Sequence, residues 1–294
     1  MKNILLLFFL AVNSLVHGQT STYDYAYLRK AKIYVYSIAD KKELFVTNDG
    51  VNPNISPEGK KLAYTIIGKD TKMGPTRFIG VIDLNTKSKI ILNTHDDNCY
   101  GPIWSPDGKW IAYNVSNKKN WSIAFMGSAN STSPKFISAE NSFSPHWLSG
   151  GTSIISHNMQ KITVYDLTGK TIKNYNMQDL EGGLHELKGM IGSANSDDFI
   201  PINDNKKIVF NCMVNEPGED GPPSAVFVYD INSKKTLRVS PKGYSANNLA
   251  INNNKVFFAA SKIDSEEINT YSVDLDGNNY KLFLANCYSM SLKQ

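Results

Sequence analysis

The sequence predicts an all-β protein, a six-bladed β-propeller built from four-stranded antiparallel blades. Three observations favour this fold. One strand–turn–strand motif occurs five times, successive copies lie roughly 48 residues apart, and a strand near the N-terminus lacks a partner in its own repeat. A β-sandwich with an N-terminal tail is the alternative.

The recurring motif is an apolar strand, a turn and a second apolar strand. Its sharpest copy, PIWSPDGKWIAY, spans 102–113, and the other copies span 54–64, 145–156, 201–210 and 249–258. Pro-Asp-Gly and Asn-rich segments are typical of tight turns, so each copy predicts a β-hairpin. The spacing of the copies suits one four-stranded blade per repeat.

A second set of strands fills the other half of each period. Residues 33–38, 78–84, 162–167, 225–231 and 270–275 are almost continuously apolar, and 121–126 is a weaker member of the set. Continuous apolar character indicates burial on both faces, as expected for inner strands, and we take these strands as the first of each repeat.

The two ends of the chain predict how the ring closes. Residues 287–292 form a strand that no further strand follows, whereas 23–28 alternate and precede the first continuously apolar strand. We expect the N-terminal strand to complete the last blade. Such closure removes exposed sheet edges.

The first residues have the pattern of a secretory signal peptide. Lys2 precedes an apolar stretch at 4–12, and residues 16–18 form a small-residue cleavage site. We expect residues 1–18 to be removed before Gln19. A buried N-terminal strand or an uncleaved anchor is the alternative.

The remaining chain, 19–294, predicts a single exported domain. No later segment is apolar enough to cross a membrane, so we expect no transmembrane segment and a periplasmic or secreted protein. The Asn- and Lys-rich composition favours a bacterial cell envelope. Cys99, Cys212 and Cys287 are an odd number of cysteines, which leaves at least one free thiol, and their spacing does not resemble a zinc site.

The motif copies resemble the WD40-like repeat of TolB-type six-bladed propellers. The resemblance is carried by WSPDGKWIAY at 104–113 and extends over nearly all of 22–294. It implies the propeller fold and says little about function, because this fold hosts many functions. TolB carries a separate α/β domain before its propeller, and this chain looks like a stand-alone propeller.

Charge excludes one class of partner. The chain has 31 basic and 27 acidic residues, a net charge of +4, and this small excess does not predict a nucleic-acid partner.

In a propeller the turns alternate between two faces. The face with the Pro-Asp-Gly-type turns, called the lower face, is rich in lysine. It predicts weak contact with anionic surfaces, although lysines in exposed turns also serve solubility.

The opposite face, called the upper face, carries most of the acidic loops and is the predicted ligand site. Asp49, Asp97, Glu140 and Asp197 precede successive strands at similar offsets, so we expect them to ring the channel mouth. Carboxylates around one axis suit calcium or another divalent ion, although solvated loop acids are the alternative and no calcium-binding loop motif is present. No cofactor is expected otherwise. Candidate binding residues on this face are Asp49, His95, Asp96, Asp97, Tyr100, Glu140, His146, Glu186, Asp197 and Asp198.

One insertion departs from the repeat. Within 178–196, Leu180, Leu184, Leu187 and Ile191 have helical spacing, but neighbouring glycines exclude a long helix. The segment predicts a short helix that caps the upper opening, or an element that docks a partner. A mobile surface excursion is the alternative.

These patterns favour a monomeric, non-catalytic protein that binds a protein, peptide or glycan partner on its upper face. The alternative is a metal-assisted lyase or hydrolase that acts on a sugar or lactone at the channel mouth. That reaction needs His95, His146 or His185 to converge with carboxylates near the axis. A third hypothesis is a scaffold that docks through its lower face.

Overall fold

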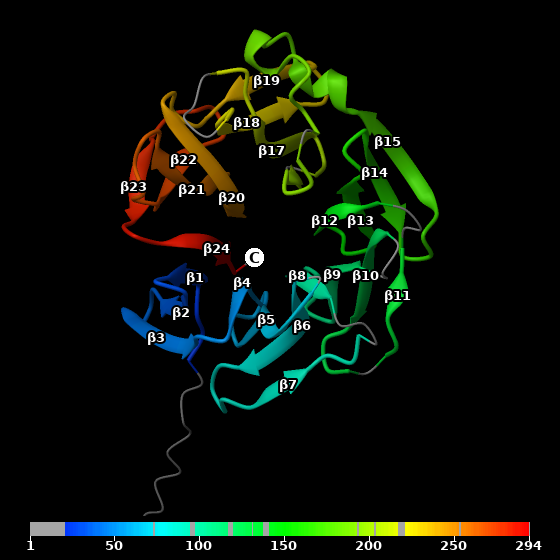
Figure 1. Ribbon diagram of the computed structural model, residues 1–294, viewed down its shortest axis with the longest axis vertical. Helices are drawn as coiled ribbons and strands as arrows, with labels where there is room; N and C mark the ends of the chain where they lie inside the picture. Colours follow the sequence, from blue (N-terminus) through cyan, green and yellow to red (C-terminus); the bar gives the residue numbers. More distant parts are fainter. Residues whose placement is uncertain are drawn as a thin grey trace, which may run out of the picture.

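The computed structural model describes residues 21–72, 74–94, 98–116, 120–130, 132–137, 141–192, 194–202, 204–216, 221–252 and 254–293. In these residues the strands form six four-stranded sheets arranged as blades around a central axis (Figure 1). The predicted all-β six-bladed propeller is confirmed. The predicted signal peptide at 1–18 lies outside the described residues.

All strands pair with antiparallel neighbours, and each blade is described from the axis outward. Blade 1 contains β24 (Tyr288–Leu292), β1 (Tyr25–Arg29), β2 (Lys32–Ser37) and β3 (Lys42–Thr47). Blade 2 contains β4 (Gly50–Ile55), β5 (Lys61–Thr71), β6 (Gly74–Asp83) and β7 (Lys89–Ile91). Blade 3 contains β8 (Cys99–Trp104), β9 (Trp110–Ser116), β10 (Trp121–Gly127) and β11 (Lys135–Phe136). Blade 4 contains β12 (Phe143–Trp147), β13 (Ser153–His157), β14 (Lys161–Asp166) and β15 (Thr171–Asn176). Blade 5 contains β16 (Phe199–Ile202), β17 (Lys207–Met213), β18 (Ser224–Asp230) and β19 (Lys235–Arg238). Blade 6 contains β20 (Tyr244–Asn252), β21 (Lys255–Lys262), β22 (Asn269–Asp274) and β23 (Lys281–Leu284).

The hydrophobic core is divided into six clusters, one between each pair of neighbouring blades. Strand β6 shows why its sequence is almost continuously apolar. Ile79 and Val81 pack toward blade 3, whereas Ile82 packs toward blade 1. Side chains on both faces of the strand are therefore buried, as the sequence predicts. All three cysteines are buried, and none of them forms a disulfide bond.

The tryptophans of the repeat tie neighbouring blades together. Trp104 is 2% exposed, and its indole Nε1 donates a hydrogen bond to the carbonyl of Asn54 in blade 2, at 3.0 Å. Trp147 makes the equivalent bond to the carbonyl of Ile103, also at 3.0 Å. Buried indole N–H groups need such acceptors. The Trp of the sequence motif therefore stabilises the packing of one blade on the previous one.

The ring closes by pairing of the two ends of the chain, which confirms the predicted closure. β1 pairs with β24 in the register Tyr25↔Leu292 and Ala26↔Ser291. The backbone N–H of Lys293 also donates to the carbonyl of Asp24 at 2.8 Å. The closing blade takes one strand from the C-terminus and three from the N-terminus. The almost continuously apolar strands, expected to be the inner and first strands, are third from the axis in each blade, and the strand–turn–strand motif forms the inner two.

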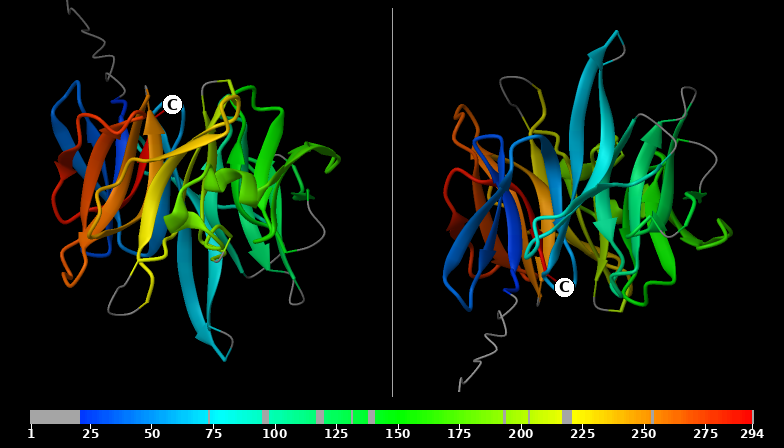
Figure 2. Two further views of the ribbon diagram at one scale, coloured as in Figure 1. Left: turned by 90° about the horizontal axis from the view of Figure 1, so that it is seen from above. Right: turned by 90° about the horizontal axis from the view of Figure 1, so that it is seen from below.

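The upper face carries one projecting element. The hairpin of β5 and β6 extends well beyond the rest of the ring when the molecule is seen from the side (Figure 2). β5 has 11 residues and β6 has 10, whereas the corresponding strands of the other blades have five to eight. The described residues contain no helix long and apolar enough to cross a membrane.

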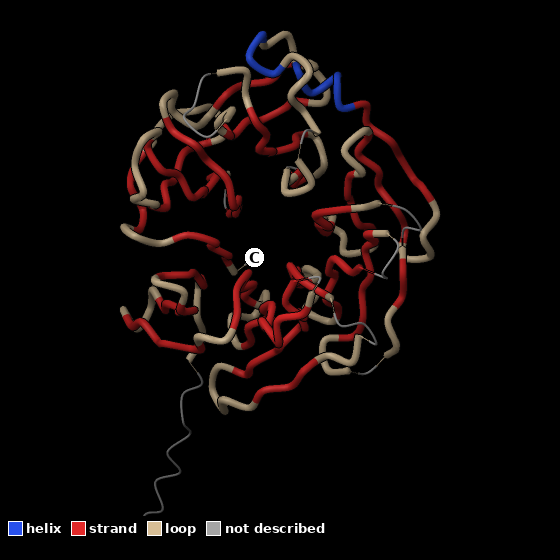
Figure 3. The backbone as a smooth tube through the Cα atoms, in the orientation of Figure 1, coloured by secondary structure: helices blue, strands red, loops and turns tan. Residues whose placement is uncertain are grey.

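The helical part of the insertion lies at the rim and not over the upper opening, whereas its last residue, Ser196, lines the axial cavity described below. It contains two short 3-10 helices, η1 (Met177–Glu181) and η2 (His185–Leu187), at the outer edge of the ring (Figure 3). Leu180 and Leu187 are buried in the cluster between blades 4 and 5. The Thr236 hydroxyl on β19 donates to the Leu180 carbonyl at 2.6 Å. Burial of these leucines explains why the helices pack on the blades and do not cap the axis.

Candidate functional site

An axial cavity of about 230 Å³ forms where the innermost strands converge. All six blades contribute to its wall, for example through Asn54, Tyr100, His146, Asp198, Asn248 and Ser291. Several lining residues lie near the start of their strands. Others, such as Asn54, His146 and Ser291, are the next-to-last residues of theirs, so the cavity extends along the channel instead of lying at one face.

Bulges in the innermost strands shape this wall. Asn52, Gly101, Ser144, Asn248 and Ser289 all have positive φ, between 50° and 64°. Each lies at or beside a register shift in the pairing of its strand. A bulge leaves a residue unpaired and bends the strand. At Gly101 a Cβ would lie 3.0 Å from Nδ2 of Asn114, so glycine suits both the backbone and the space there.

The orientation of two lining amides is determined by the backbone groups they contact. The N–H of Trp104 donates to Oδ1 of Asn54 at 2.9 Å, and the N–H of Ser144 donates to Oδ1 of Asn114 at 3.0 Å. A backbone N–H only donates, so the amide oxygen must face it. The Nδ2 groups of Asn54 and Asn114 therefore point away from these contacts.

A histidine and a carboxylate form the one side-chain ion pair among the described residues of the cavity wall. Nε2 of His146 lies 3.1 Å from Oδ1 of Asp198, and their side chains are 13% and 24% exposed. A carboxylate only accepts, so Nε2 carries the hydrogen of this bond. The backbone N–H of Asp198 donates to Oδ1 of Asn211 at 3.1 Å, which holds the carboxylate in place.

Two buried titratable groups lie near this pair. Burial and the nearby Asp198 carboxylate together raise the pKa of Asp197 to about 7, although backbone hydrogen bonds from Ala194 and Gly192 oppose the rise. Burial lowers the pKa of His157 to about 4. Oδ2 of Asp197 and Nε2 of His157 have no hydrogen-bond partner in the described structure. Burial therefore disfavours the charged form of both side chains.

The structure brings together some of the residues predicted from the sequence. Tyr100, His146 and Asp198 line the cavity, and Asp197 is buried next to Asp198. The predicted candidates His95, Asp96, Asp97 and Glu140 lie outside the described residues.

Asp49 is placed away from the axis. Nζ of Lys89, on the outer strand β7, donates to Oδ2 of Asp49 at 2.6 Å. Burial raises the pKa of Asp49, but the hydrogen bonds from Lys89 and Thr47 outweigh it and hold the pKa below its ordinary value. Asp49 is therefore a partner of an outer strand and does not line the cavity.

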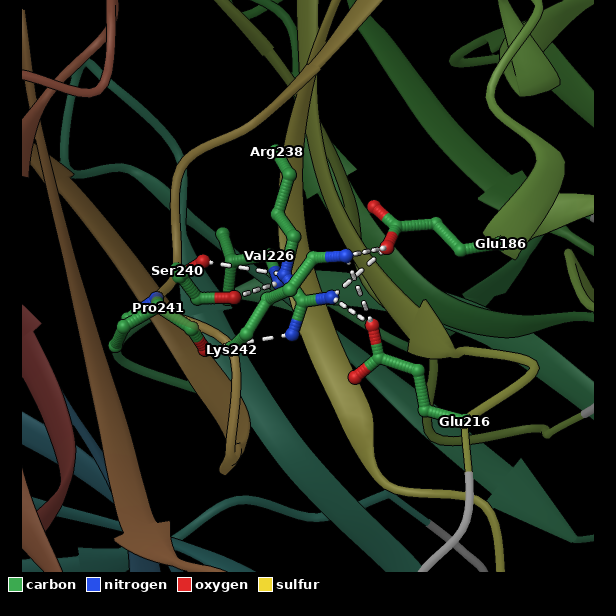
Figure 4. A network of polar contacts seen from close by, with 7 residues as sticks. All are labelled: Glu186, Glu216, Val226, Arg238, Ser240, Pro241 and Lys242. Carbon is green, nitrogen blue, oxygen red and sulfur yellow. Dashed lines mark hydrogen bonds and ion pairs between the residues drawn. The ribbon is translucent and has the colours of Figure 1, made fainter.

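Glu186 belongs to a charged network at the rim (Figure 4). Nη1 of Arg238 donates to Oε2 of Glu186 at 3.0 Å and to Oε1 of Glu216 at 2.7 Å. Nζ of Lys242 lies 3.8 Å from both carboxylates. Nε and Nη2 of Arg238 donate to the carbonyls of Ser240 and Pro241. The network joins the insertion and the β17–β18 loop to blade 5.

The cavity-lining asparagines were not among the residues predicted from the sequence. Asn54 and His146 occupy the repeat position that Ile103 occupies in the sharpest copy, and Asn114 directly follows that copy. The sequence did contain a signal for these residues: they are polar at positions where the repeat favours apolar side chains. This part of each innermost strand faces the axis, so a polar residue there indicates a cavity-lining position.

The described residues do not assemble the metal site that the enzymatic alternative needs. Within them, no three His, Cys, Asp or Glu side chains are placed to hold a metal ion. His146 meets one carboxylate there, that of Asp198, and His185 lies in η2 at the rim.

Solved structures with the same fold are readily found. TolB from Acinetobacter baumannii matches with a TM-score of 0.64 and 18% identity, over 92% of this chain and 66% of that one. A structure assigned as TolB from Agrobacterium tumefaciens matches with a TM-score of 0.63 and 16% identity, over 92% of this chain and 94% of that one. A chain of a nidogen/laminin complex matches with a TM-score of 0.61 and 8% identity, over 92% and 99%. No family model and no curated protein matches the sequence. At these identities the likeness concerns the fold, and the chain has the fold of a TolB-type six-bladed β-propeller.

Proposed function

We propose that this protein is an exported, non-catalytic binding protein that docks a protein partner on its upper face. The observation that carries the proposal is the arm, defined as residues 67–77 of the β5–β6 hairpin. Elaboration of one face of a rigid scaffold is typical of binding sites.

The arm is an ordered hairpin that projects into solvent. Its strands pair in the register Ile67↔Arg77, Asp70↔Pro75 and Thr71↔Gly74. The described side chains from Ile67 to Pro75 are exposed. At about 3.3 Å per residue, the four residues of β5 after Ile67 extend the strand by about 13 Å.

The base of the arm is fixed to the ring. Nε of Arg77 donates to Oδ1 of Asn98 at 2.8 Å. The guanidinium carbon of Arg77 lies 4.4 Å from the ring centre of Tyr100 and 5.7 Å from that of Trp121. Such cation–π contacts hold the arm in one direction. A partner would therefore meet a preorganised surface, which lowers the entropy cost of binding.

The arm carries features of a docking element. Beyond Ile67 and Arg77, its strand edges pair with no other strand in the described structure. An exposed hairpin edge invites unwanted association unless it is used. Lys69 and Lys72 outnumber Asp70 at the tip, which favours a partner with an acidic surface. The matching chain of the nidogen/laminin complex supports the use of this fold in a protein assembly.

The lower face is proposed to contribute less. Exposed lysines occupy its turns in five blades, at Lys41, Lys60, Lys109, Lys170 and Lys206. We expect weak contact with anionic vesicles that disappears as salt is raised, because exposed charges are screened.

Shortening the arm tests the docking proposal. Replacing residues 68–76 by Asn-Gly joins Ile67 to Arg77, which already face each other in the register. A two-residue Asn-Gly turn suits such a pair, so the ring should fold unchanged. A photo-crosslinking amino acid at Lys72, with one at Lys170 on the lower face as the matched control, would then be used in cells that produce the protein.

We expect one crosslinked protein at position 72 and none at 170. The shortened variant should melt at the wild-type temperature but no longer co-purify with that protein. The docking proposal is wrong if position 72 gives no specific adduct, or if the shortened variant retains the partner at wild-type affinity.

A further inference from the structure

The axial cavity has a wall that is polar but nearly uncharged. Its polar groups are mostly asparagine amides and serine hydroxyls, and Asp198, paired with His146, is the one acidic side chain among the described lining residues. Lysine and arginine are absent from that lining. This chemistry disfavours a strongly charged ligand and suits a neutral one that both donates and accepts hydrogen bonds.

Hydrogen-bond donors line the wall formed by blades 2 and 3. The oxygens of Asn54 and Asn114 are already occupied by the N–H groups of Trp104 and Ser144. Nδ2 of Asn54 has no partner in the described structure. Nδ2 of Asn114 makes one long contact, 3.4 Å to the carbonyl of Tyr100, and keeps a second N–H. These donors are oriented before any ligand arrives.

The opposite wall offers an acceptor. In a ring of six blades, blade 5 with Asp198 lies across from blade 2 with Asn54. Oδ1 of Asp198 accepts from His146, which leaves Oδ2 for a ligand. Apolar groups of Pro53, Pro102 and Leu249 also line the cavity. A ligand therefore needs acceptors on one edge, donors on the other and an apolar face.

Extended peptides fit this cavity poorly. A peptide usually adds to a free strand edge through its backbone. Bulges interrupt five of the six innermost strands, at Asn52, Gly101, Ser144, Asn248 and Ser289, so no continuous backbone edge faces the axis there. Side chains supply the polar contacts instead.

We propose that the axial cavity binds one neutral sugar ring, either a free hexose or the terminal residue of a glycan. A hexose has hydroxyls that donate and accept around its rim, and C–H groups on its faces. The volume of about 230 Å³ has room for a single ring. The arm touches the cavity wall where Arg77 stacks on Tyr100, but the shortened variant keeps both residues, so the two proposals are tested separately.

Titration with sugars tests the inference. Glucose, galactose, mannose and N-acetylglucosamine would be added to the purified mature protein and followed by saturation-transfer NMR and calorimetry. Glucuronate, protonated glucosamine and glycylglycine serve as anionic, cationic and peptide comparators. We expect saturable binding of at least one neutral sugar with a Kd of about 1 mM, as a small ligand in a small polar site allows.

Two substitutions locate the site. Asn54→Asp keeps an oxygen for the Trp104 N–H but replaces the donating NH₂ by a second acceptor, and Asn114→Asp does the same for Ser144. Each should weaken sugar binding about tenfold or more, equivalent to one good hydrogen bond. The matched control is Asn174→Asp on the outer strand β15, where Oδ1 accepts from Thr163 at 2.9 Å. Melting curves confirm that each variant is folded.

The possible outcomes separate the alternatives. Saturable binding of a neutral sugar that is lost in Asn54→Asp or Asn114→Asp and kept in Asn174→Asp supports the inference. Three results would overturn it: no saturable binding of any of the four sugars, tighter binding of glycylglycine or glucosamine than of every neutral sugar, or unchanged sugar affinity in both cavity variants.

Discussion

Replacing Arg238 by methionine would remove the guanidinium at the centre of the rim network and keep most of the aliphatic stem. Arg238 is 9% exposed at its side chain and donates to Glu186, Glu216 and two backbone carbonyls. The variant leaves two carboxylates close together with no arginine between them. It therefore tests whether this network holds the insertion and the β17–β18 loop on blade 5.

The expected loss of stability follows from burial. Removing one partner of a buried ion pair typically costs about 3–5 kcal/mol. The side chains of Glu186 and Glu216 are 16% and 20% exposed, and Nζ of Lys242 lies 3.8 Å from a carboxylate oxygen of each. Water and Lys242 therefore recover part of the loss, and we expect a net cost of about 2–3 kcal/mol. For a chain of this size, that lowers the melting temperature by about 4–5 °C.

The stability difference between the wild type and Arg238→Met should depend on pH in one direction. Burial raises the pKa of Glu216, but the hydrogen bond and charge of Arg238 outweigh it and hold the pKa below its ordinary value of 4.5. A lowered folded-state pKa contributes stability above the ordinary value, and the contribution is lost as pH falls through the folded-state pKa. Wild type and Arg238→Met should therefore differ most near neutral pH and converge in acid.

Urea unfolding at several pH values, followed by circular dichroism, measures both effects. The triple variant Glu186→Gln, Glu216→Gln, Arg238→Met is the matched control, because it removes the unpaired charges and should regain part of the lost stability. A loss below about 1 kcal/mol at neutral pH would refute the assigned role of the network. A difference that grows in acid would refute the electrostatic reasoning.

Three further predictions concern the cavity, the N-terminus and metal binding. Because the pKa of Asp197 is raised to about 7, its contribution to stability is full below its ordinary pKa of 3.8 and is lost as pH rises toward 7. In urea unfolding, the stability of Asp197→Asn should depend less on pH than that of the wild type, whereas Asp70→Asn at the exposed arm should leave the pH dependence unchanged. Equal slopes of unfolding free energy against pH in the wild type and both variants would contradict the burial argument. Mass spectrometry of the exported protein should find Gln19 as the first residue, and retention of residues 1–18 would disprove cleavage. Chelation by EDTA should leave the melting temperature unchanged; a drop that calcium reverses would favour the divalent-ion site at the channel mouth.

Much of the fold could be predicted because its signals are local. The alternation of apolar residues, the turn at 105–109 and the Trp at position 104 repeat with the period of a blade, and each has a local physical cause. Closure by 23–28 was predictable for the same reason, since one strand was left over at each end. The grouping of strands into blades was not, because a cyclic repeat has no natural starting point and only the hydrogen-bonded pairs define one.

The candidate site was predictable only in part. Tyr100, His146 and Asp198 were selected as polar residues of the upper face, and they do line one cavity. Asp49 and Glu186 were selected on the same grounds, yet Lys89 and Arg238 hold them on the outer strands. Loop position in a sequence does not say whether a side chain turns to the axis or to the rim.

The number of blades and the way the ring closes could both be obtained from the order of residues along the chain. Which polar groups share the axial cavity, how the amides of Asn54 and Asn114 are oriented, and where the insertion packs emerged only from the folded ring. The reason is that strands and turns depend on neighbours within a few residues, whereas the cavity joins residues from all six blades. Their distances are set only when the packed ring has closed.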